Sequence, residues 1–310
     1  MKKWMLILLI AALLVGCSPQ KSVEPTLDAN LLYTQAAGTV AAQLTAEYTP
    51  PPTETPIPTL EPTATETVVP TPTTAPTLPW AYNEPGKVIA PILIYTHIAD
   101  NVDDNPYYQH ESPLNISPEM FREQMTALKQ AGYTTIPVSL LVEALRNGAE
   151  LPAKPVVVTF EGGTIGIYNK AFPIMQELGL VGSVFMVANH VDGNGTLSTS
   201  QLKELIAAGW DVGSKGMNSV DLVEKPNKMS EEISGSKLKL EEKLGVPITV
   251  FSYPYGRVDG AVATRVSEWG YLGAVGIFKS TEHTLNTLYY LARYEIRNDF
   301  TMADFMTIFE

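Results

Sequence analysis

The sequence predicts an α/β protein whose parallel strands form a distorted (β/α) barrel of about seven units. Three observations support this fold class. Short runs of β-branched residues alternate with longer amphipathic segments from residue 88 to residue 309, glycines close most of the amphipathic segments, and no glycine-rich nucleotide motif follows the first strand. Such alternation is typical of parallel sheets, and the number of units favours a barrel over an open doubly wound sheet, which is the alternative.

The elements follow in a regular order along the chain. The first strand is expected at residues 88–95, and Ser117 before Pro118 predicts the start of a helix that runs to about residue 131. The other strands are expected at residues 134–138, 155–160, 181–187, 210–214, 248–253, 271–277 and 289–296. The other helices are expected at residues 140–146, 167–178, 198–208, 230–244, 260–269 and 302–309.

The first residues have the pattern of a secretory signal. Lys2 and Lys3 precede an apolar run over residues 4–15, which is too short to cross a bilayer as a helix. Residues 14–17 resemble the bacterial lipobox, so residues 1–16 are expected to be a lipoprotein signal peptide and Cys17 the lipidated residue. The alternative is an ordinary signal peptide that contains a cysteine. Cys17 is the only cysteine, which excludes an internal disulfide and a thiolate zinc cluster.

Residues 17–86 are expected to form a Pro/Thr-rich, disordered linker ahead of a domain at 87–310. Residues 50–79 are dense in proline, which favours extended chain and cannot build a core. This linker suits a stalk that holds the domain away from a membrane, or a spacer of no required length. The chain carries a net charge of −12 and no Lys or Arg between Ser22 and Gly86. The absence of a basic stripe argues against nucleic acid as a partner.

Four segments at the predicted carboxyl ends of strands are rich in Gly, Pro and Tyr. Functional groups of parallel barrels lie at this end, so these segments are expected to meet at one site, the barrel mouth. The segments are Tyr95-Thr96-His97, Glu161-Gly162-Gly163, Ser214 to Ser219, and Tyr253-Pro254-Tyr255-Gly256.

These segments together resemble a known family. ILIYTHI, VVVTFEGG, WDVGSKGMNSVDL, FSYPYG and LARYEI are similar, in order and spacing, to motifs of the polysaccharide deacetylases, the NodB-type domain of carbohydrate esterase family 4. The resemblance covers about residues 88–310 and is nearest to the poly-N-acetylglucosamine branch. It implies a distorted barrel, a divalent metal such as zinc, and removal of acetyl groups from N-acetylated sugars.

The chain departs from the family at the metal site. The family's acidic pair, a general base and a metal ligand, falls on Glu161 and Gly162, and its two metal histidines fall on Lys215 and Ser219. A catalytic zinc needs about three protein ligands and an open position. Glycine offers no ligand, lysine repels a cation and serine is a poor neutral ligand. The sequence therefore predicts no bound metal. Glu161 is expected to contact a ligand, to accept amide hydrogen bonds from the glycine turn, or to pair with Lys215, whose ammonium would then fill the place of the ion.

Other family positions are kept or shifted. The Pro254-Tyr255-Gly256 turn remains, and in the family the amide at this tyrosine helps to hold the oxyanion. The family's histidine after the first strand falls on Thr96, with His97 beside it, and Arg293 matches an arginine of the poly-N-acetylglucosamine branch. Glu161 is the one weak catalytic candidate, because a general base alone supplies only about 10²–10⁴-fold.

The candidate substrate-binding residues have alternative structural roles. Aromatic rings suit stacking on a sugar face, but they also pack barrel rims. Arg293 is expected to hold either a substrate carboxylate or Glu161. The candidate set is Tyr95, Thr96, His97, Lys215, Tyr253, Pro254, Tyr255 and Arg293.

A relocated metal site has little support, because the remaining histidines show no paired ligand spacing. His190 and Asp192 are expected to form a polar turn, and His110 and His283 to lie in solvated loops.

Three functions are consistent with these observations. The first is a membrane-anchored, extracytoplasmic domain that binds glycan or peptidoglycan without metal catalysis. The second is an active deacetylase with an altered site, and the third is a scaffold for a protein partner. The identity of Gly162, Lys215 and Ser219 separates the first from the second.

Overall fold

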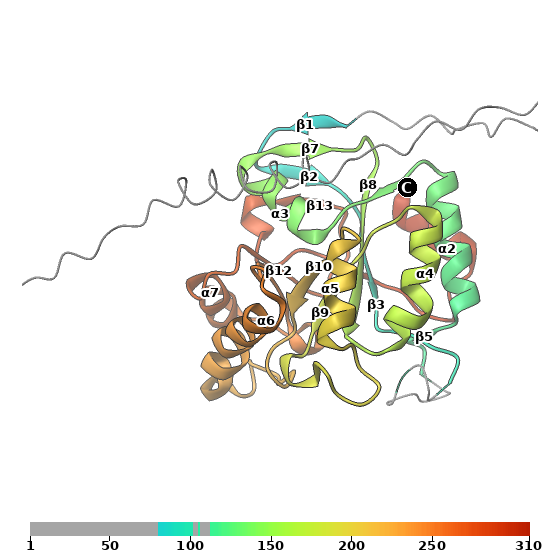
Figure 1. Ribbon diagram of the computed structural model, residues 1–310. Helices are drawn as coiled ribbons and strands as arrows, with labels where there is room; N and C mark the ends of the chain where they lie inside the picture. Colours follow the sequence, from blue (N-terminus) through green and yellow to red (C-terminus); the bar gives the residue numbers. More distant parts are fainter. Residues whose placement is uncertain (1–79, 102–104, 106–111) are drawn as a thin grey trace, which may run out of the picture. The chain divides into compact units, whose positions relative to one another are not determined.

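The computed structural model describes residues 80–101, 105 and 112–310 (Figure 1). The predicted signal peptide, Cys17, most of the predicted linker and His110 lie outside these residues.

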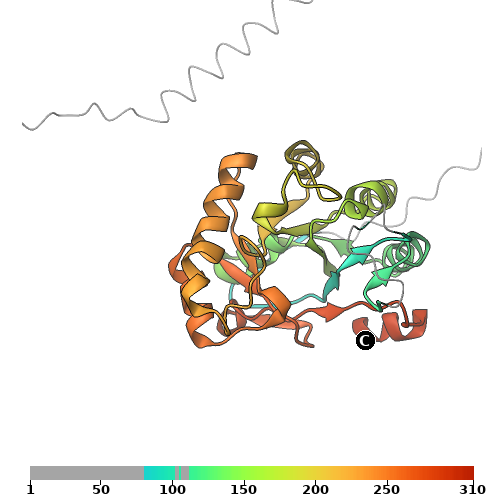
Figure 2. The same ribbon diagram turned by 90° about the horizontal axis from the view of Figure 1, so that it is seen from below.

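A curled parallel sheet forms the centre of the fold, as predicted. Its order is β12-β11-β10-β9-β8-β3-β14, and short β6 pairs with β8. An additional parallel bridge joins Val275 to Leu291, so the segment leading into β14 contacts both ends of the sheet, and the strands curl around a common centre (Figure 2). The strands are β3 (Ile92–Tyr95), β6 (Thr134–Thr135), β8 (Pro155–Gly162), β9 (Ser183–Met186), β10 (Asp211–Ser214), β11 (Val250–Ser252), β12 (Gly273–Val275) and β14 (Tyr294–Glu295). The prediction of an α/β barrel is confirmed.

Most helices cover the outside of this sheet, whereas α3 packs against the inner apolar cluster, and the helix ends follow local sequence signals. Ser117 caps the first helix by accepting a hydrogen bond from the amide of Met120, and Ser198 forms a capping box with Gln201. Glycines in the left-handed conformation end two other helices. The helices are α2 (Pro118–Gln130), α3 (Val138–Asn147), α4 (Phe172–Leu178), α5 (Thr199–Ala207), α6 (Ser236–Leu244), α7 (Gly260–Glu268) and α8 (Met302–Met306).

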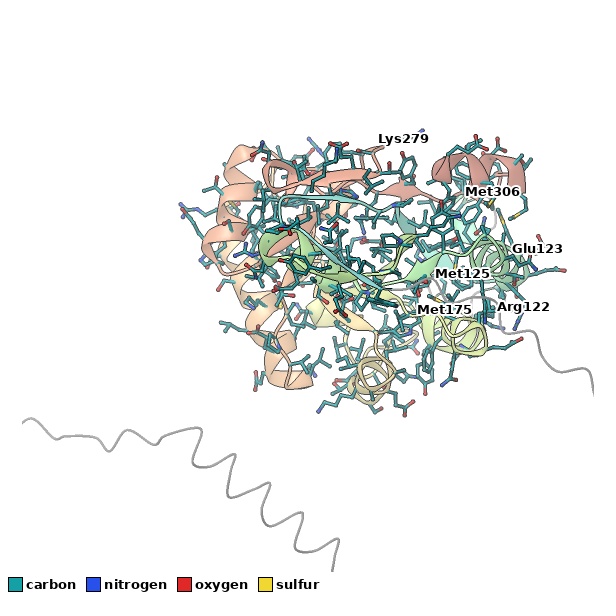
Figure 3. The ribbon with its side chains drawn as sticks, turned by 90° about the horizontal axis from the view of Figure 1, so that it is seen from above. Arg122, Glu123, Met125, Met175, Lys279 and Met306 are labelled. Carbon is teal, nitrogen blue, oxygen red and sulfur yellow. The ribbon has the colours of Figure 1, made fainter. Side chains whose placement is uncertain are left out.

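Two apolar layers result from the alternation of side chains along the strands. The outer layer lies between the sheet and the helices and includes Met125 of α2 and Met175 of α4 (Figure 3). Arg122 of α2 also pairs with Glu177 of α4 at 2.7 Å. The inner layer is a separate cluster that also includes residues of α3. Its members on the sheet strands are Ile92, Val157, Phe185, Val250 and Val275.

The expected first strand is interrupted. Residues 88–95 form two strands, β2 (Lys87–Ile89) and β3, with Ala90 and Pro91 between them. Proline has no amide hydrogen for a sheet ladder, which explains the break. β2 instead pairs antiparallel with β13 (Glu282–Thr284).

The folded body also begins earlier than predicted. β1 (Ala81–Asn83) lies in the segment assigned to the linker, yet it pairs antiparallel with β7 (Ala149–Leu151). Another small parallel pair, β4 (His97–Ile98) with β5 (Asn115–Ile116), follows β3. Such strands of two or three residues give no periodicity that a sequence could reveal.

Candidate functional site

The side chain of Glu161 points into the barrel because of its position on β8. Val157, Thr159 and Glu161 are alternate residues of this strand, so their side chains share one face. Val157 belongs to the inner apolar cluster, which identifies that face as the interior. Glu161 is only 2% exposed and lies near the carboxyl end of the strand. A carboxylate at this depth requires partners.

Three side chains from other strands and loops converge on the Glu161 carboxylate. Arg293 Nη1 lies 2.5 Å from Oε1, and the Ser252 hydroxyl donates a hydrogen bond to the same oxygen at 2.8 Å. Lys215 Nζ lies 2.6 Å from Oε2. Of the roles considered for Glu161, the ion pair with Lys215 is therefore present. We call Glu161, Lys215, Arg293 and Ser252 the mouth cluster.

Arg293 is the most constrained member of the mouth cluster. It is 1% exposed, and its Nε donates to the carbonyl oxygen of Gly276 at 2.9 Å while Nη2 donates to Ser252 at 3.0 Å. Its guanidinium also lies 5.4 Å from the centre of the Phe185 ring. The planar fork of an arginine suits such simultaneous contacts. Of the two roles considered for Arg293, the structure records the pairing with Glu161.

Opposing effects act on the pKa of Glu161. Burial raises the pKa, but the charges of Lys215 and Arg293, together with their hydrogen bonds, outweigh burial and lower it from 4.5 to about 2. The carboxyl group is therefore ionised at neutral pH. A carboxylate held this far below its ordinary pKa is a weak proton acceptor near pH 7.

His97 lies within the electrostatic range of this cluster. Burial, followed by the charge of Lys215, lowers the pKa of His97 to about 4, so the imidazole is neutral at pH 7. Among the described residues, its buried Nδ1 has no hydrogen-bond partner. Thr96, the preceding residue, is partly exposed. The electrostatic effect of Lys215 on His97 indicates that His97 lies near the mouth cluster, as the sequence predicts.

The loop after β10 is held by a buried carboxylate that sequence reasoning missed. Glu232 has no exposed surface and accepts hydrogen bonds from the backbone amides of Asn218 and Val220. The backbone amide of Lys215 in turn donates to Met186 on β9 at 2.8 Å. Glu232 lies in a π-helical turn, Ser230–Gly235, that precedes α6. In the sequence it is one of several acids in a charged helix, and nothing there distinguishes it.

Ser252 and Thr159 were also missed. Thr159 donates to the carbonyl oxygen of Leu93 at 2.7 Å, and Arg293 Nη1 lies 3.3 Å from its hydroxyl oxygen. The alternation of side chains along a strand could have indicated both residues. Thr159 lies two positions before Glu161 and therefore on the same face of β8, and Ser252 lies two positions after Val250 on the same face of β11.

A surface groove of about 500 Å³ adjoins the loop after β10 and the Pro-Tyr-Gly turn. Tyr255 lines it and is 70% exposed, and Arg257 crosses it to pair with Asp221 at 2.7 Å. Ser219 and Tyr255 both have φ of +60°, a conformation that non-glycine residues rarely adopt. The residues that line the groove are Asn218, Ser219, Val220, Asp221, Glu224, Lys225, Tyr255 and Arg257.

The other two candidate tyrosines occupy the core. Tyr95 has no exposed surface and donates to Gln124 at 2.7 Å, and Tyr253 is 1% exposed and donates to the carbonyl oxygen of Tyr289 at 2.9 Å. Pro254 is also buried. In this structure only Tyr255, of the three tyrosines, presents a ring to a ligand.

The mouth cluster does not fit a zinc ion. Both oxygens of Glu161, the only carboxylate in the cluster, are engaged by cations. Gly162 has φ of +77° and contributes no side chain, and Lys215 directs an ammonium at Glu161. Within the described residues, no three His, Cys, Asp or Glu side chains are grouped as a metal would require. A cation would have to displace the ammonium and find new ligands.

The remaining histidines lie elsewhere. His190 ends a short 3₁₀ turn, and Asp192 two residues on accepts from Thr199 and pairs with Lys243 at 2.8 Å, as suits a polar turn. The expectation that His283 is solvated is wrong. It lies in β13 with no exposed surface, and its Nε2 donates to the carbonyl oxygen of Ala90 at 3.0 Å.

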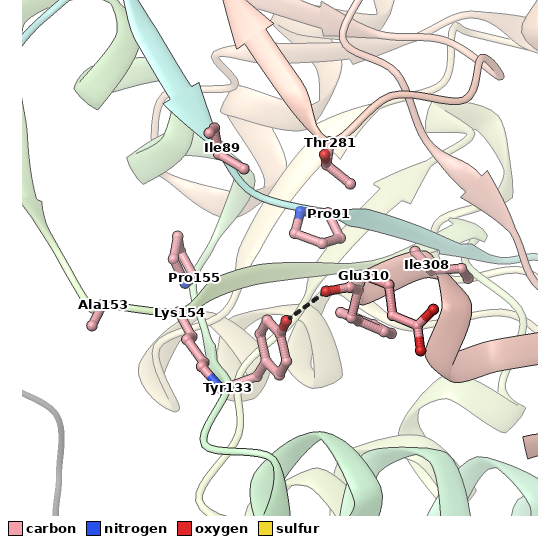
Figure 4. Close-up of a pocket in the computed structure, with 10 residues that line it drawn as sticks. Ile89, Pro91, Tyr133, Ala153, Lys154, Pro155, Thr281, Ile308 and Glu310 are labelled. Atoms are coloured by element: carbon pink, nitrogen blue, oxygen red, sulfur yellow. Dashed lines mark hydrogen bonds between the residues drawn. The ribbon is translucent and has the colours of Figure 1, made fainter. Parts of the chain in front are cut away.

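A second hollow, of about 370 Å³, lies at the opposite end of the sheet (Figure 4). It is lined by Pro155 at the start of β8, and there Tyr133 donates to the carbonyl oxygen of Phe309 at 3.3 Å. Pro155 and Glu161 are six positions apart on this strand, which is roughly 20 Å. This hollow is therefore no part of the mouth.

In the described part of the chain, no helix is long and apolar enough to cross a membrane.

Comparison with known proteins identifies the domain. The family model described as polysaccharide deacetylase matches residues 148–274, which include the whole of β8 and the loop after β10. The Bacillus subtilis protein YxkH, named as a polysaccharide deacetylase, is 24% identical over 197 residues, which span 63% of this chain and 66% of that protein. The poly-beta-1,6-N-acetyl-D-glucosamine N-deacetylase of Escherichia coli K12 is 36% identical over 98 residues, which are 32% of this chain and only 13% of that protein.

Solved structures agree with the fold. The crystal structure of BA0330 from Bacillus anthracis, named as a polysaccharide deacetylase, superposes with a TM-score of 0.63 at 27% identity, covering 72% of this chain and 70% of that one. Residues 148–274 thus match the polysaccharide deacetylase family, and the relatives and the fold support a NodB-type domain.

Proposed function

We propose that this chain is a membrane-anchored, extracytoplasmic domain of the polysaccharide deacetylase family that binds glycan or peptidoglycan and lacks the family's metal-dependent hydrolysis. One observation carries the proposal: Lys215 Nζ stands 2.6 Å from Glu161 Oε2, at the positions where the resemblance expects a metal ligand and the general base.

The electrostatics of the mouth cluster oppose metal binding. Two cationic side chains, Lys215 and Arg293, lie against one carboxylate, so a divalent cation would enter a site that already has an excess of positive charge. Zinc would otherwise lower the pKa of a bound water and polarise the acetyl carbonyl. Without that contribution, the residues of the mouth cluster can bind a sugar but supply little catalysis.

An active deacetylase with an altered site is the main alternative. It would need Glu161 as its base, but this carboxyl group has a pKa of about 2 and is engaged by Lys215 and Arg293. Efficient general bases have pKa values near the working pH. The pairing and low pKa of Glu161 therefore disfavour an active deacetylase.

The groove beside the mouth supports glycan binding. Tyr255 is exposed and flanked by polar and charged side chains, which is the chemistry that contacts pyranose rings and their hydroxyls. A scaffold for a protein partner would show no glycan retention that this ring could support. Loss of glycan retention in Tyr255→Ala but not in the control Tyr82→Ala, a tyrosine that is 59% exposed and lies outside the groove, separates the two functions.

Membrane anchoring rests on the sequence alone. The lipobox-like residues 14–17 and the unique Cys17 support diacylglycerol attachment. Radiolabelled palmitate incorporated by the wild type and not by Cys17→Ser would support it; equal incorporation would contradict it.

The decisive experiment combines metal analysis with acetate release. We expect the purified protein to hold far less than one equivalent of zinc and to release no acetate from N-acetylglucosamine oligomers. Stoichiometric zinc together with turnover would overturn the proposal.

A companion variant tests the assignment of the ligand positions. Gly162→Asp combined with Lys215→His and Ser219→His is expected to create divalent-metal affinity, while Lys215→Gln alone removes the ammonium without adding a ligand. An added Cβ at Gly162 meets no atom within 4 Å, although its φ strains any side chain. Absence of metal binding by a folded triple variant would count against the assignment.

A further inference from the structure

Among the residues that the structure describes, the mouth cluster carries an excess of positive charge. Glu161 contributes one negative charge, and Lys215 and Arg293 contribute two positive charges against it. Four carboxylates of the described neighbouring loops have other partners. Asp221 and Glu224 pair with Arg257, Asp192 pairs with Lys243, and Glu232 accepts backbone amides. Charges in an enclosed site normally occur in balanced sets.

The excess charge resides on Lys215 rather than on Arg293. Each nitrogen of the Arg293 guanidinium already donates, to Gly276, Ser252 and Glu161. An ammonium has three N–H donors. Glu161 is the one partner recorded for Lys215 Nζ among the described residues, and the Lys215 side chain is 18% exposed. The accessible end of the cluster is therefore a cation with donors to spare.

A second polar group within the electrostatic range of Lys215 also has an atom without a partner. His97 Nδ1 is buried and has no hydrogen-bond partner in the described part of the chain, and the charge of Lys215 acts on this ring. A ligand that completes both groups needs a carboxylate for the ammonium and a hydroxyl group for the imidazole. Sugars that carry a carboxyl group offer both within one small molecule.

We propose that the Lys215 end of the mouth cluster binds a carboxylate, so that the preferred ligand is an acidic sugar and not a neutral N-acetylated one. The inference rests on the proposed glycan-binding function and names its ligand class. A carboxylate over Lys215 brings the cluster to electrical neutrality, whereas a neutral sugar leaves the excess charge in place. Charge-assisted hydrogen bonds to an ammonium are also stronger than those to neutral donors.

Matched pairs of ligands test this inference. Calorimetric titration of the purified protein compares N-acetylmuramic acid with N-acetylglucosamine, and glucuronate with glucose, so that each pair differs by an acidic group. We expect the acidic member to bind at least tenfold more tightly at low salt. We further expect Lys215→Gln to reduce the difference to less than threefold, while Lys225→Gln, a lysine on the adjoining groove, leaves it unchanged.

The outcomes distinguish failure of the acidic-sugar inference from failure of the proposed glycan-binding function. Equal affinity within each pair, or a preference that survives in Lys215→Gln, overturns the acidic-sugar inference and leaves glycan binding intact. Failure to bind any of the four sugars or a longer glycan overturns both. Should Lys215→Gln fail to fold, the wild type in 1 M salt decides instead, because screening must diminish a preference based on charge. A preference unchanged by salt contradicts the inference.

Discussion

On the inner face of the barrel, the side chains at the starts of the strands are apolar, and those at the ends of the same strands are polar or charged. Val157 on β8 and Val250 on β11 belong to an apolar cluster, while Glu161 and Ser252, further along these strands, belong to the mouth cluster. Both layers are buried almost completely. The first is stabilised by packing alone, and the second requires every charge to find a partner. The mouth cluster therefore tolerates single substitutions less well, which the following variants test.

The largest effect is expected from Arg293→Met. The change removes a buried cation and leaves Glu161 and the carbonyl oxygen of Gly276 short of a donor. Glu161 keeps its ion pair with Lys215, so the cost comes from the buried acceptors that lose a donor, at about 1–3 kcal/mol for each. Urea denaturation measures the loss in the free energy of unfolding. The control Arg257→Met removes a half-exposed arginine and is expected to cost less than about 1 kcal/mol. Similar losses in the two variants would refute the contrast.

The pH dependence of stability tests the charge state of the cluster. The pKa of Glu161 is lowered to about 2 in the folded protein, so its stabilising contribution is present above pH 4.5 and disappears as the pH falls towards 2. The shift corresponds to about 3 kcal/mol at most. We expect the wild type to lose more stability between pH 5 and pH 2 than Glu161→Gln does. Parallel curves for the two proteins would show that Glu161 titrates normally.

Exchanging isosteric residues between the layers should produce intermediate effects. Val157→Thr places a hydroxyl in the apolar layer, and Thr159→Val removes the donor to the carbonyl oxygen of Leu93. Each leaves a buried polar group without a partner, at a cost of about 1–3 kcal/mol. Thermal unfolding of both variants checks this. If Val157→Thr is neutral, the inner layer contains water or another polar partner for the new hydroxyl, which contradicts a purely apolar layer.

The smallest effect on stability is expected at the exposed rim. Tyr255→Ala is expected to change the free energy of unfolding by less than about 0.5 kcal/mol, because the ring is 70% exposed. The same variant should reduce glycan retention, measured by affinity electrophoresis. A large loss of stability would indicate that the ring packs against the groove.

Much of the architecture could be predicted from local sequence signals. The helix cap at Ser117, the glycine at position 245 and the run from Val156 to Phe160 each determine an element through contacts a few residues away. The two- and three-residue strands could not be predicted, because β1 and β2 exist only through pairing with distant partners. The burial of His283 has the same origin.

The sequence by itself determined that a lysine and a glycine occupy the positions where the resemblance expects metal ligands, because residue identity needs no fold to be read. Only the tertiary structure decided which charges meet. Glu161, Ser252 and Arg293 are separated by up to 132 residues, and curling of the sheet brings their side chains within hydrogen-bond distance. Tyr95 and Tyr255 show the same division. Both are tyrosines at expected strand ends, but only packing decides that one ring is buried and the other faces solvent.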